Sequence, residues 1–204
     1  FYMDIASSIQ NVTEEIIIKS LKFAKGKYKL ENLCLAGGVA LNCVVNGKLQ
    51  KEKIFKNIWI QPASGDAGGA IGSALALWYT DKNNKRLVEK NDSMNGSYLG
   101  PSYSNDEIQK ILDNVNATYK LLDEEELIEK TTKILCDGGA VGWFQGRSEF
   151  GPRALGNRSI LGDPRSDTMQ KDLNLKTKFR ENFRPFAPAV LEEEAHNWFE
   201  IDVD

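Results

Sequence analysis

The alternation of helical and extended segments in the first eighty residues most constrains the fold of this chain. Apolar residues recur at helical spacing over residues 5–24. Short apolar strands are predicted at 33–36 and 54–61, each followed by a glycine-bearing turn and then a helix, at 39–50 and 70–79. The second of these helices is rich in Ala and Leu, and we expect it to be buried. This order is typical of a layered sheet, so we predict the α/β fold class.

Composition indicates a globular protein without a membrane segment. Hydrophobic residues make up 41% of the 204, and no apolar run approaches the length of a membrane span. The N-terminus lacks the basic start and apolar core of a signal peptide. The scattered cysteines, Cys34, Cys43 and Cys136, predict neither a disulfide framework nor a structural zinc site, so we expect a reducing cytoplasm. Because the chain does not begin with Met, we expect it to be a piece of a longer protein.

A polar, aperiodic segment over residues 81–97 separates two parts of the chain. We predict domains at 1–84 and 98–204, joined by a linker at 85–97. In the second part, two capping boxes predict helix starts, Ser104 with Glu107 and Asp123 with Glu126. Strands are predicted at 140–144, 160–161 and 187–191, and a helix is predicted to open at 192–194.

The two glycine-bearing turns suit a nucleotide. In residues 36–42 the glycines let backbone N–H groups face a phosphate at a helix start, although a plain turn is the alternative. In residues 64–70, Asp66 could hold a divalent cation, although composition alone favours a helix N-cap. If the two strands are neighbours, both turns lie at the carboxyl ends of the sheet, and a nucleotide can lie across them.

A later segment, residues 142–161, concentrates arginine among glycines, and a basic cluster over 176–184 follows it. Between residues 143 and 188, nine Lys and Arg face five Asp and Glu, a local charge of +4 in a chain of net charge −3. Guanidinium groups match phosphate and carboxylate oxygens. Because these charges are interleaved with aromatic and aliphatic residues, we predict an anion pocket and not a solvated charged face. The charge is too local for a nucleic-acid surface.

Four motifs together resemble those of the O-carbamoyltransferases of the NodU and antibiotic-tailoring type. The motifs lie at 35–42, 64–72, 146–160 and 183–188. The resemblance touches most of the chain, and the third motif is the most specific. The first two are shared more loosely with enzymes that transfer a threonylcarbamoyl group to tRNA.

The resemblance implies the C-terminal part of an actin-like ATPase (ASKHA) domain, followed by part of a YrdC-like α/β domain. It implies ATP, a divalent metal (Fe²⁺ or Mg²⁺) and carbamoyl phosphate as co-substrate. Carbamoyl phosphate would be broken down to carbamate and activated as carbamoyl-adenylate. The carbamoyl group would then pass to a hydroxyl of a small acceptor, such as a sugar or an antibiotic-like compound. We expect no membrane and no nucleic-acid partner, and a homodimer stays open.

The resemblance also implies roles for individual residues. Asp66 would be a metal ligand. The nucleotide would be contacted by Gly37, Gly38 and Asn42. Carbamoyl phosphate would be gripped by Arg147, Lys178, Arg180 and Arg184, with Arg153, Asn157 and Arg158 shaping the same neighbourhood.

The chain departs from the family pattern at the metal site. That site also uses a His-x-x-x-His pair, whereas this sequence holds only His196. The first half of the ATPase fold is absent from the sequence as well, so we expect the longer parent protein to be the enzyme. Threonylcarbamoyl transfer to tRNA and a non-catalytic anion-binding module stay as alternatives.

Overall fold

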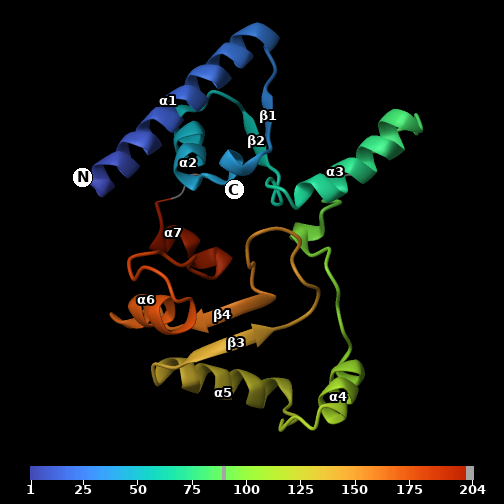
Figure 1. Cartoon of the computed structure of the whole chain (residues 1–204), viewed down its shortest axis with the longest axis vertical. Helices are drawn as coiled ribbons and strands as arrows, with labels where there is room; N and C mark the ends of the chain where they lie inside the picture. Colours follow the sequence, from blue (N-terminus) through green and yellow to red (C-terminus); the bar gives the residue numbers. More distant parts are fainter. Residues whose placement is uncertain (89–90, 201–204) are drawn as a thin grey trace. The chain divides into compact units, whose positions relative to one another are not determined.

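The computed structural model describes residues 1–88 and 91–200 and has a mixed α/β architecture with two two-stranded sheets (Figure 1). The predicted α/β class is confirmed. Residues 89–90 of the predicted linker and 201–204 of the predicted rear domain lie outside the described residues. None of the described helices is both long and apolar enough to cross a membrane.

Contacts divide the chain into two compact units. Unit 1 comprises residues 1–102 and 146–155, and unit 2 comprises residues 103–145 and those from 156 onward. The segment 146–155 therefore groups with the first unit, whereas the sequence-based division kept it in the rear domain.

The described residues of unit 1 form three α-helices, two strands and three short helical turns. These are α1 (Tyr2–Tyr28), β1 (Asn32–Leu35), η1 (Gly38–Leu41), α2 (Cys43–Glu52), β2 (Asn57–Ile60), α3 (Gly68–Ala76), η2 (Leu77–Asp81) and η3 (Asn95–Ser97). The single helix predicted at 39–50 is thus a 3₁₀ turn followed by an α-helix.

The core of unit 1 lies between α1, α2 and one face of the strands. β1 and β2 run parallel, with Leu35 opposite Ile60. Val45 and Leu49 of α2 are fully buried and pack with Ile18 of α1. Figure 1 shows α2 beside α1. Trp59 points to the other face and is 47% exposed. Parallel sheets normally have both faces covered. In the described residues, this two-stranded sheet has only one face covered.

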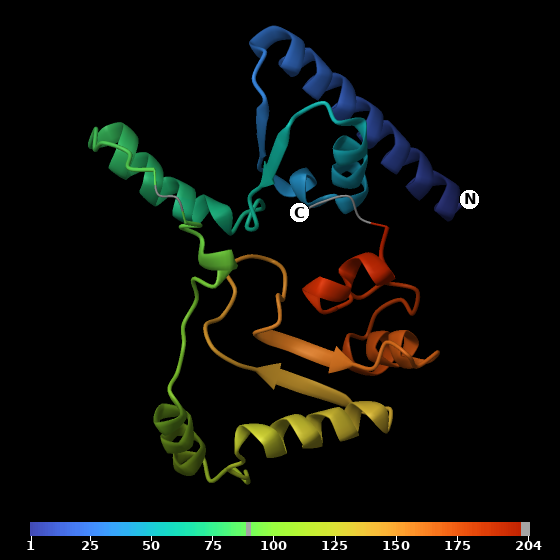
Figure 2. The ribbon, with the colours of Figure 1, turned by 180° about the vertical axis from the view of Figure 1, so that it is seen from behind.

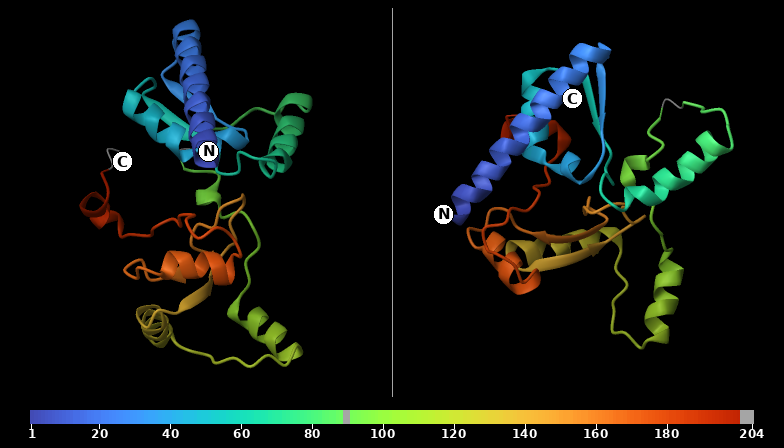
Figure 3. Two further views of the ribbon diagram at one scale, coloured as in Figure 1. Left: turned by 60° about the vertical axis from the view of Figure 1, so that its left-hand side comes forward. Right: turned by 45° about the horizontal axis from the view of Figure 1, so that its top comes forward.

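The expectation that the Ala- and Leu-rich helix is buried is wrong. No residue of α3 is buried, and Leu75, Leu77 and Trp78 are about half exposed. Figure 3 shows α3 standing beside the β1–β2 pair without covering it. Apolar composition makes a helix suited to burial, but a partner element must supply the burial.

Unit 2 combines an antiparallel strand pair with helices. Its elements are α4 (Asn105–Asn114), α5 (Glu124–Cys136), β3 (Ala140–Phe144), β4 (Arg158–Gly162), α6 (Met169–Asp172), η4 (Leu173–Thr177), η5 (Glu192–Glu194) and α7 (Ala195–Trp198). Both predicted helix starts are confirmed, since the side chains of Ser104 and Asp123 each accept a backbone N–H three residues on. Figure 2 shows α5 running alongside β3. Met169 and Leu173 are buried beside β4.

The strand predicted at 187–191 is wrong, and the helical start at 192–194 is confirmed. Residues 187–190 are irregular, and the described sheet of unit 2 contains β3 and β4 alone. Pro188 offers no N–H to a strand ladder, which disfavours pairing at this position.

Candidate functional site

The two glycine-bearing turns lie together at the carboxyl ends of β1 and β2. The strands are parallel neighbours, as the predicted arrangement required. The Gly37 N–H donates to the Ser64 carbonyl oxygen at 2.8 Å, so the turns are hydrogen-bonded to each other. Gly37 has a φ of 101°, a conformation that favours glycine. The 3₁₀ turn η1 starts at the next residue, Gly38, so its first residues follow closely on the carboxyl end of β1.

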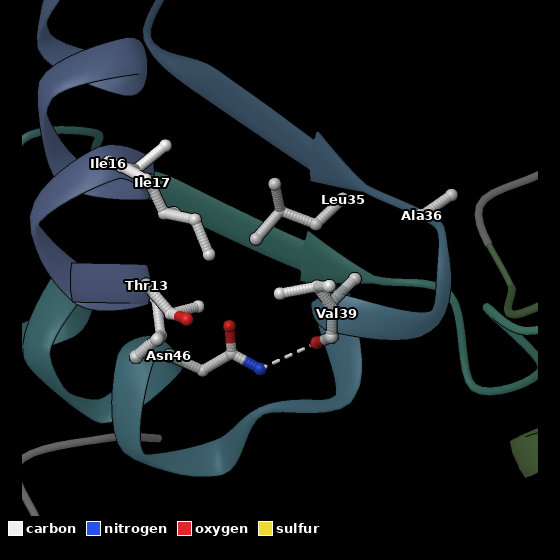
Figure 4. A pocket seen from close by; sticks show the side chains of 9 residues that line it. Thr13, Ile16, Ile17, Leu35, Ala36, Val39 and Asn46 are labelled. Carbon is white, nitrogen blue, oxygen red and sulfur yellow. Dashed lines mark hydrogen bonds between the residues drawn. The ribbon is translucent and has the colours of Figure 1, made fainter. Parts of the chain in front are cut away.

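A pocket of about 340 Å³ lies beside the first of these turns (Figure 4). Its walls are mostly apolar and come from α1, β1 and η1, with Ile17, Leu35 and Val39 among them. Asn46 adds a polar group, and its Nδ2 donates to the Ala40 carbonyl oxygen at 2.8 Å. A pocket of this size with apolar walls and few polar groups is typical of a small-molecule site.

Asn42 is committed to a helix cap. Its Oδ1 accepts the Val45 N–H at 3.2 Å, and its Nδ2 donates to Gln10 Oε1 at 2.8 Å. Gln10 also donates to Glu14, a buried carboxylate that pairs with Lys48 at 3.2 Å. These hydrogen bonds, from Gln10 first and Lys48 second, lower the pKa of Glu14. The network fixes the start of α2 against α1.

Asp66 is exposed on the second turn. The N-cap interpretation is wrong, because the cap position of α3 is Ala67 and this helix start has no side-chain cap within the described residues. Ser64, two residues earlier, is a residue that the sequence did not single out. Its side chain is 6% exposed, and in the described part of the chain its Oγ has no hydrogen-bond partner. A buried hydroxyl in this state is costly unless a ligand or another group satisfies it.

The loop that carries Arg147 and Arg153 is docked within unit 1. Ser97 forms two hydrogen bonds with the backbone of Phe150. The Phe150 N–H donates to the Ser97 carbonyl oxygen at 2.7 Å, and Ser97 Oγ donates to the Phe150 carbonyl oxygen at 2.9 Å. The Gly100 N–H donates to the Ser148 carbonyl oxygen at 2.9 Å. Backbone hydrogen bonds to Ser97 and Gly100 therefore hold the loop in place.

Gly151 brings this loop against the turn that follows β2. Its φ is 130°, and a Cβ at this position would lie 3.2 Å from the Pro62 carbonyl oxygen. Ala63, beneath it, is 1% exposed. The third motif therefore lies against the two residues that precede the second motif, Pro62 and Ala63. Arg147 Nη1 donates to the Gly100 carbonyl oxygen at 2.9 Å, whereas Arg153 is exposed.

Asn157 and Arg158 tie together the ends of β3 and β4 in unit 2. Arg158 Nη1 donates to the carbonyl oxygens of Gln145, at 2.6 Å, and of Asn157, at 2.8 Å. The guanidinium lies 3.4 Å from the centroid of the Phe144 ring, a cation–π contact. Gln145 Nε2 donates to Asn157 Oδ1 at 3.2 Å. Both predicted ligand-binding residues therefore have structural partners.

The basic segment of unit 2 is organised by a buried amide. Arg180 Nε donates to Asn174 Oδ1 at 2.6 Å, and the Arg180 guanidinium lies 5.0 Å from the Phe186 ring. Arg184 forms an ion pair with Glu181 at 2.8 Å, and Lys178 is exposed. Asn174 was not predicted. Its position between two leucines in a helical turn is the one sequence signal that could have indicated burial.

The predicted site residues are divided between the two units. Unit 1 holds Gly37, Gly38, Asn42, Asp66, Arg147 and Arg153, and unit 2 holds Asn157, Arg158, Lys178, Arg180 and Arg184. Among the described residues, no group of three or more His, Cys, Asp or Glu side chains could hold a metal ion.

Comparison with known proteins adds two family matches. Residues 2–75 match the model of the carbamoyltransferase N-terminus, and residues 132–204 match that of the carbamoyltransferase C-terminus. An uncharacterized protein of Synechocystis sp. is 58% identical over 202 residues, which cover 98% of this chain and 33% of that protein. Nodulation protein NolNO of Sinorhizobium fredii is 39% identical over 201 residues (98% of this chain, 29% of that protein). Nodulation protein NolO of Bradyrhizobium diazoefficiens is 38% identical over 203 residues (98% and 36%). The chain spans about a third of the length of these relatives.

Proposed function

This chain belongs to the carbamoyltransferase family, and from that premise we propose that it serves the ATP-dependent transfer of a carbamoyl group to an acceptor hydroxyl. Water converts carbamoyl phosphate to carbamate and phosphate. Carbamate then attacks the α-phosphorus of ATP, which gives carbamoyl-adenylate and releases pyrophosphate. The acceptor hydroxyl takes the carbamoyl group, AMP leaves, and the hydroxyl proton is lost. The acceptor is a small molecule such as a sugar or an antibiotic-like compound.

The observation that carries the nucleotide part of this proposal is the hydrogen bond between the two glycine-bearing turns. It joins Gly37 to Ser64 at the carboxyl ends of two parallel strands, where α/β proteins bind nucleotides. The apolar pocket beside η1 suits a flat, weakly polar group such as a nucleobase. On this basis we propose that residues 1–84 are part of an actin-like ATPase domain. The proposal of a YrdC-like domain at 98–204 rests on the motif resemblance alone, and residues 98–102 and 146–155 of that range group with unit 1.

A divalent metal, Fe²⁺ or Mg²⁺, would use Asp66 as one ligand. Asp66 is an exposed carboxylate on the second turn. The described residues supply no further carboxylate, histidine or cysteine cluster beside it, so they do not fit a complete metal site by themselves. The metal is therefore kept out of the steps above.

Carbamoyl phosphate would be bound by cationic side chains. Arg180 and Arg184 lie on one hydrogen-bonded segment of unit 2, with Lys178 close by in sequence. Their role is to neutralise the phosphate and to stabilise it as it leaves. Arg147, on the loop of unit 1, is proposed separately as a residue that binds a phosphate group.

Pyrophosphate release by the full-length gene product tests this function. We expect release that depends on both ATP and carbamoyl phosphate, and a fall of about 100-fold in Arg184→Ala, because one charge-stabilising donor is lost. Lys133→Ala on α5 removes an exposed positive charge outside the basic segment and should retain activity. Absence of carbamoyl-phosphate-dependent pyrophosphate release would contradict the proposed activity and favour the alternative of a non-catalytic anion-binding module. Full activity of Arg184→Ala would contradict the assignment of the phosphate site.

A further inference from the structure

We infer that Asn174 is a positioning residue that fixes the Arg180 guanidinium for the carbamoyl phosphate anion, an inference that rests on the function proposed above. Asn174 lies in η4 and is 0% exposed, between the buried Leu173 and the segment that carries the basic residues. A fully buried carboxamide is costly unless its hydrogen bonds are made.

Every hydrogen of the Asn174 amide group is used on the basic segment. Its Nδ2 donates to the carbonyl oxygens of Asn182, at 3.2 Å, and Arg184, at 2.8 Å. Its Oδ1 accepts from Arg180 Nε at 2.6 Å. One side chain therefore sets both the backbone path of residues 182–184 and the direction of the Arg180 guanidinium.

The hydrogen bond to Nε leaves the outer edge of the Arg180 guanidinium for an anion. Among the described residues, neither Nη group of Arg180 has a hydrogen-bond partner, and the side chain is partly exposed. The carbon of the Arg180 guanidinium lies 5.0 Å from the centroid of the Phe186 ring, a cation–π contact that adds a second restraint. A guanidinium held at Nε and by this ring keeps its two Nη groups for an anion, and paired N–H donors of this kind match phosphate oxygens.

Gln170 provides a control within the same unit. Its Nε2 donates to the carbonyl oxygens of Phe183, at 3.0 Å, and Arg184, at 3.1 Å. Gln170 thus holds the same stretch of backbone as Asn174, but among the described residues its amide forms no hydrogen bond with Arg180, and its side chain is exposed. The two residues separate the effect of fixing the backbone from the effect of fixing the guanidinium.

The test is a double-mutant cycle on the full-length gene product, read as the KM for carbamoyl phosphate and for ATP in pyrophosphate release. We expect Asn174→Ala to raise the KM for carbamoyl phosphate roughly tenfold, because a hydrogen bond to a charged group is lost. The KM for ATP should stay unchanged. In an Arg180→Ala background the same substitution should add little, because no guanidinium is left to position and Gln170 still donates to the carbonyl oxygens of Phe183 and Arg184. Gln170→Ala should change the KM for carbamoyl phosphate less than threefold.

A purely structural role would lower the thermal midpoint without this split between substrates and would add to the effect of Arg180→Ala. If Asn174→Ala does not fold, Asn174→Asp replaces it in the cycle. The aspartate keeps an acceptor for Arg180, but its negative charge competes with the anion for the Arg180 guanidinium. We therefore expect Asn174→Asp to raise the KM for carbamoyl phosphate when Arg180 is present. In the Arg180→Ala background the same substitution should cause no further rise. An unchanged KM in an active Asn174 variant, with Arg180→Ala impaired, overturns this inference alone. A parent protein without carbamoyl-phosphate-dependent release overturns the proposed function with it.

Discussion

Units 1 and 2 present their candidate binding groups in different ways. In unit 1 the groups are backbone amides and loop residues, shaped by glycines such as Gly37 and Gly151 at positive φ. These loops are joined by backbone hydrogen bonds, from Gly37 to Ser64 and from Gly100 to Ser148. In unit 2 the groups are long cationic side chains, and Asn174 and aromatic rings hold them.

This difference determines how each unit can be damaged. A Cβ added at Gly68, Gly100 or Gly151 would meet backbone atoms of another segment, and backbone cannot rotate away as a flexible side chain can. A cationic side chain fails instead when the group that orients it is removed, and the fold around it can persist. Steric substitutions should therefore test unit 1, and substitutions of hydrogen-bond partners should test unit 2.

The largest effect is expected for Gly68→Ala at the start of α3. A Cβ at this position would lie 2.1 Å from the Ala63 carbonyl oxygen, so the turn after β2 must move. We expect a loss of about 1–3 kcal/mol in the free energy of unfolding, measured by urea denaturation. Gly72→Ala in the same helix meets nothing within 4 Å and should be neutral or stabilising, by up to about 1 kcal/mol. Equal stability of the two variants would contradict the backbone-built description of unit 1.

Asn42 tests whether a side chain in unit 1 binds the nucleotide or only shapes the loop. Asn42→Ala removes the cap of α2 and should cost about 1 kcal/mol of unfolding free energy. Asn42→Ser restores a capping hydroxyl, so we expect stability near that of the parent and unchanged ATP affinity by calorimetry. A loss of ATP affinity in the stable Asn42→Ser variant would instead support direct contact with the nucleotide.

Local patterns in the sequence predicted the elements of both units well. The apolar spacing of α1, the two short strands and the caps at Ser104 and Asp123 depend on neighbours within a few residues, and these predictions are confirmed. The adjacency of the two glycine-bearing turns was expected only if the two strands were neighbours, and the structure meets that condition. Predictions failed where a distant partner decides the outcome. The exposure of α3 and the irregular path of residues 187–190 both depend on what lies beside them.

The candidate site was predictable only for residues that carry a motif. Glycines and arginines mark their loops, but docking of the 146–155 loop on Ser97 depends on contacts about fifty residues apart. Asn174 and Ser64 carry no charge and no motif, so only burial in three dimensions distinguishes them. Sequence composition likewise could not show that Arg158 is engaged by Phe144 and by carbonyl oxygens.

Arg158→Lys tests how unit 2 holds its cationic side chains, and we expect a smaller loss of stability than for Gly68→Ala. A lysine keeps the charge but loses the planar contact with Phe144 and the hydrogen bond to Gln145. We expect a loss of about 0.5–1 kcal/mol in the free energy of unfolding. Arg153→Lys, at an exposed position of the loop in unit 1, should leave stability unchanged. A similar loss in both variants would mean that the partners of Arg158 do not matter to the fold of unit 2.

The smallest effect is expected from Asp163, and it should appear only in acid. Arg165 donates from its side chain to both Asp163 carboxylate oxygens, and this lowers the pKa of Asp163 to about 2. An unfolded chain has an Asp pKa of about 3.9. Because the folded pKa is the lower one, the stabilisation is present above about pH 4 and is lost as the pH falls towards 2. Asp163→Asn removes this titration, so its unfolding midpoint should fall less steeply than that of the parent between about pH 4 and pH 2. A parent slope in Asp163→Asn would show that the Arg165 contact contributes nothing to folding in solution.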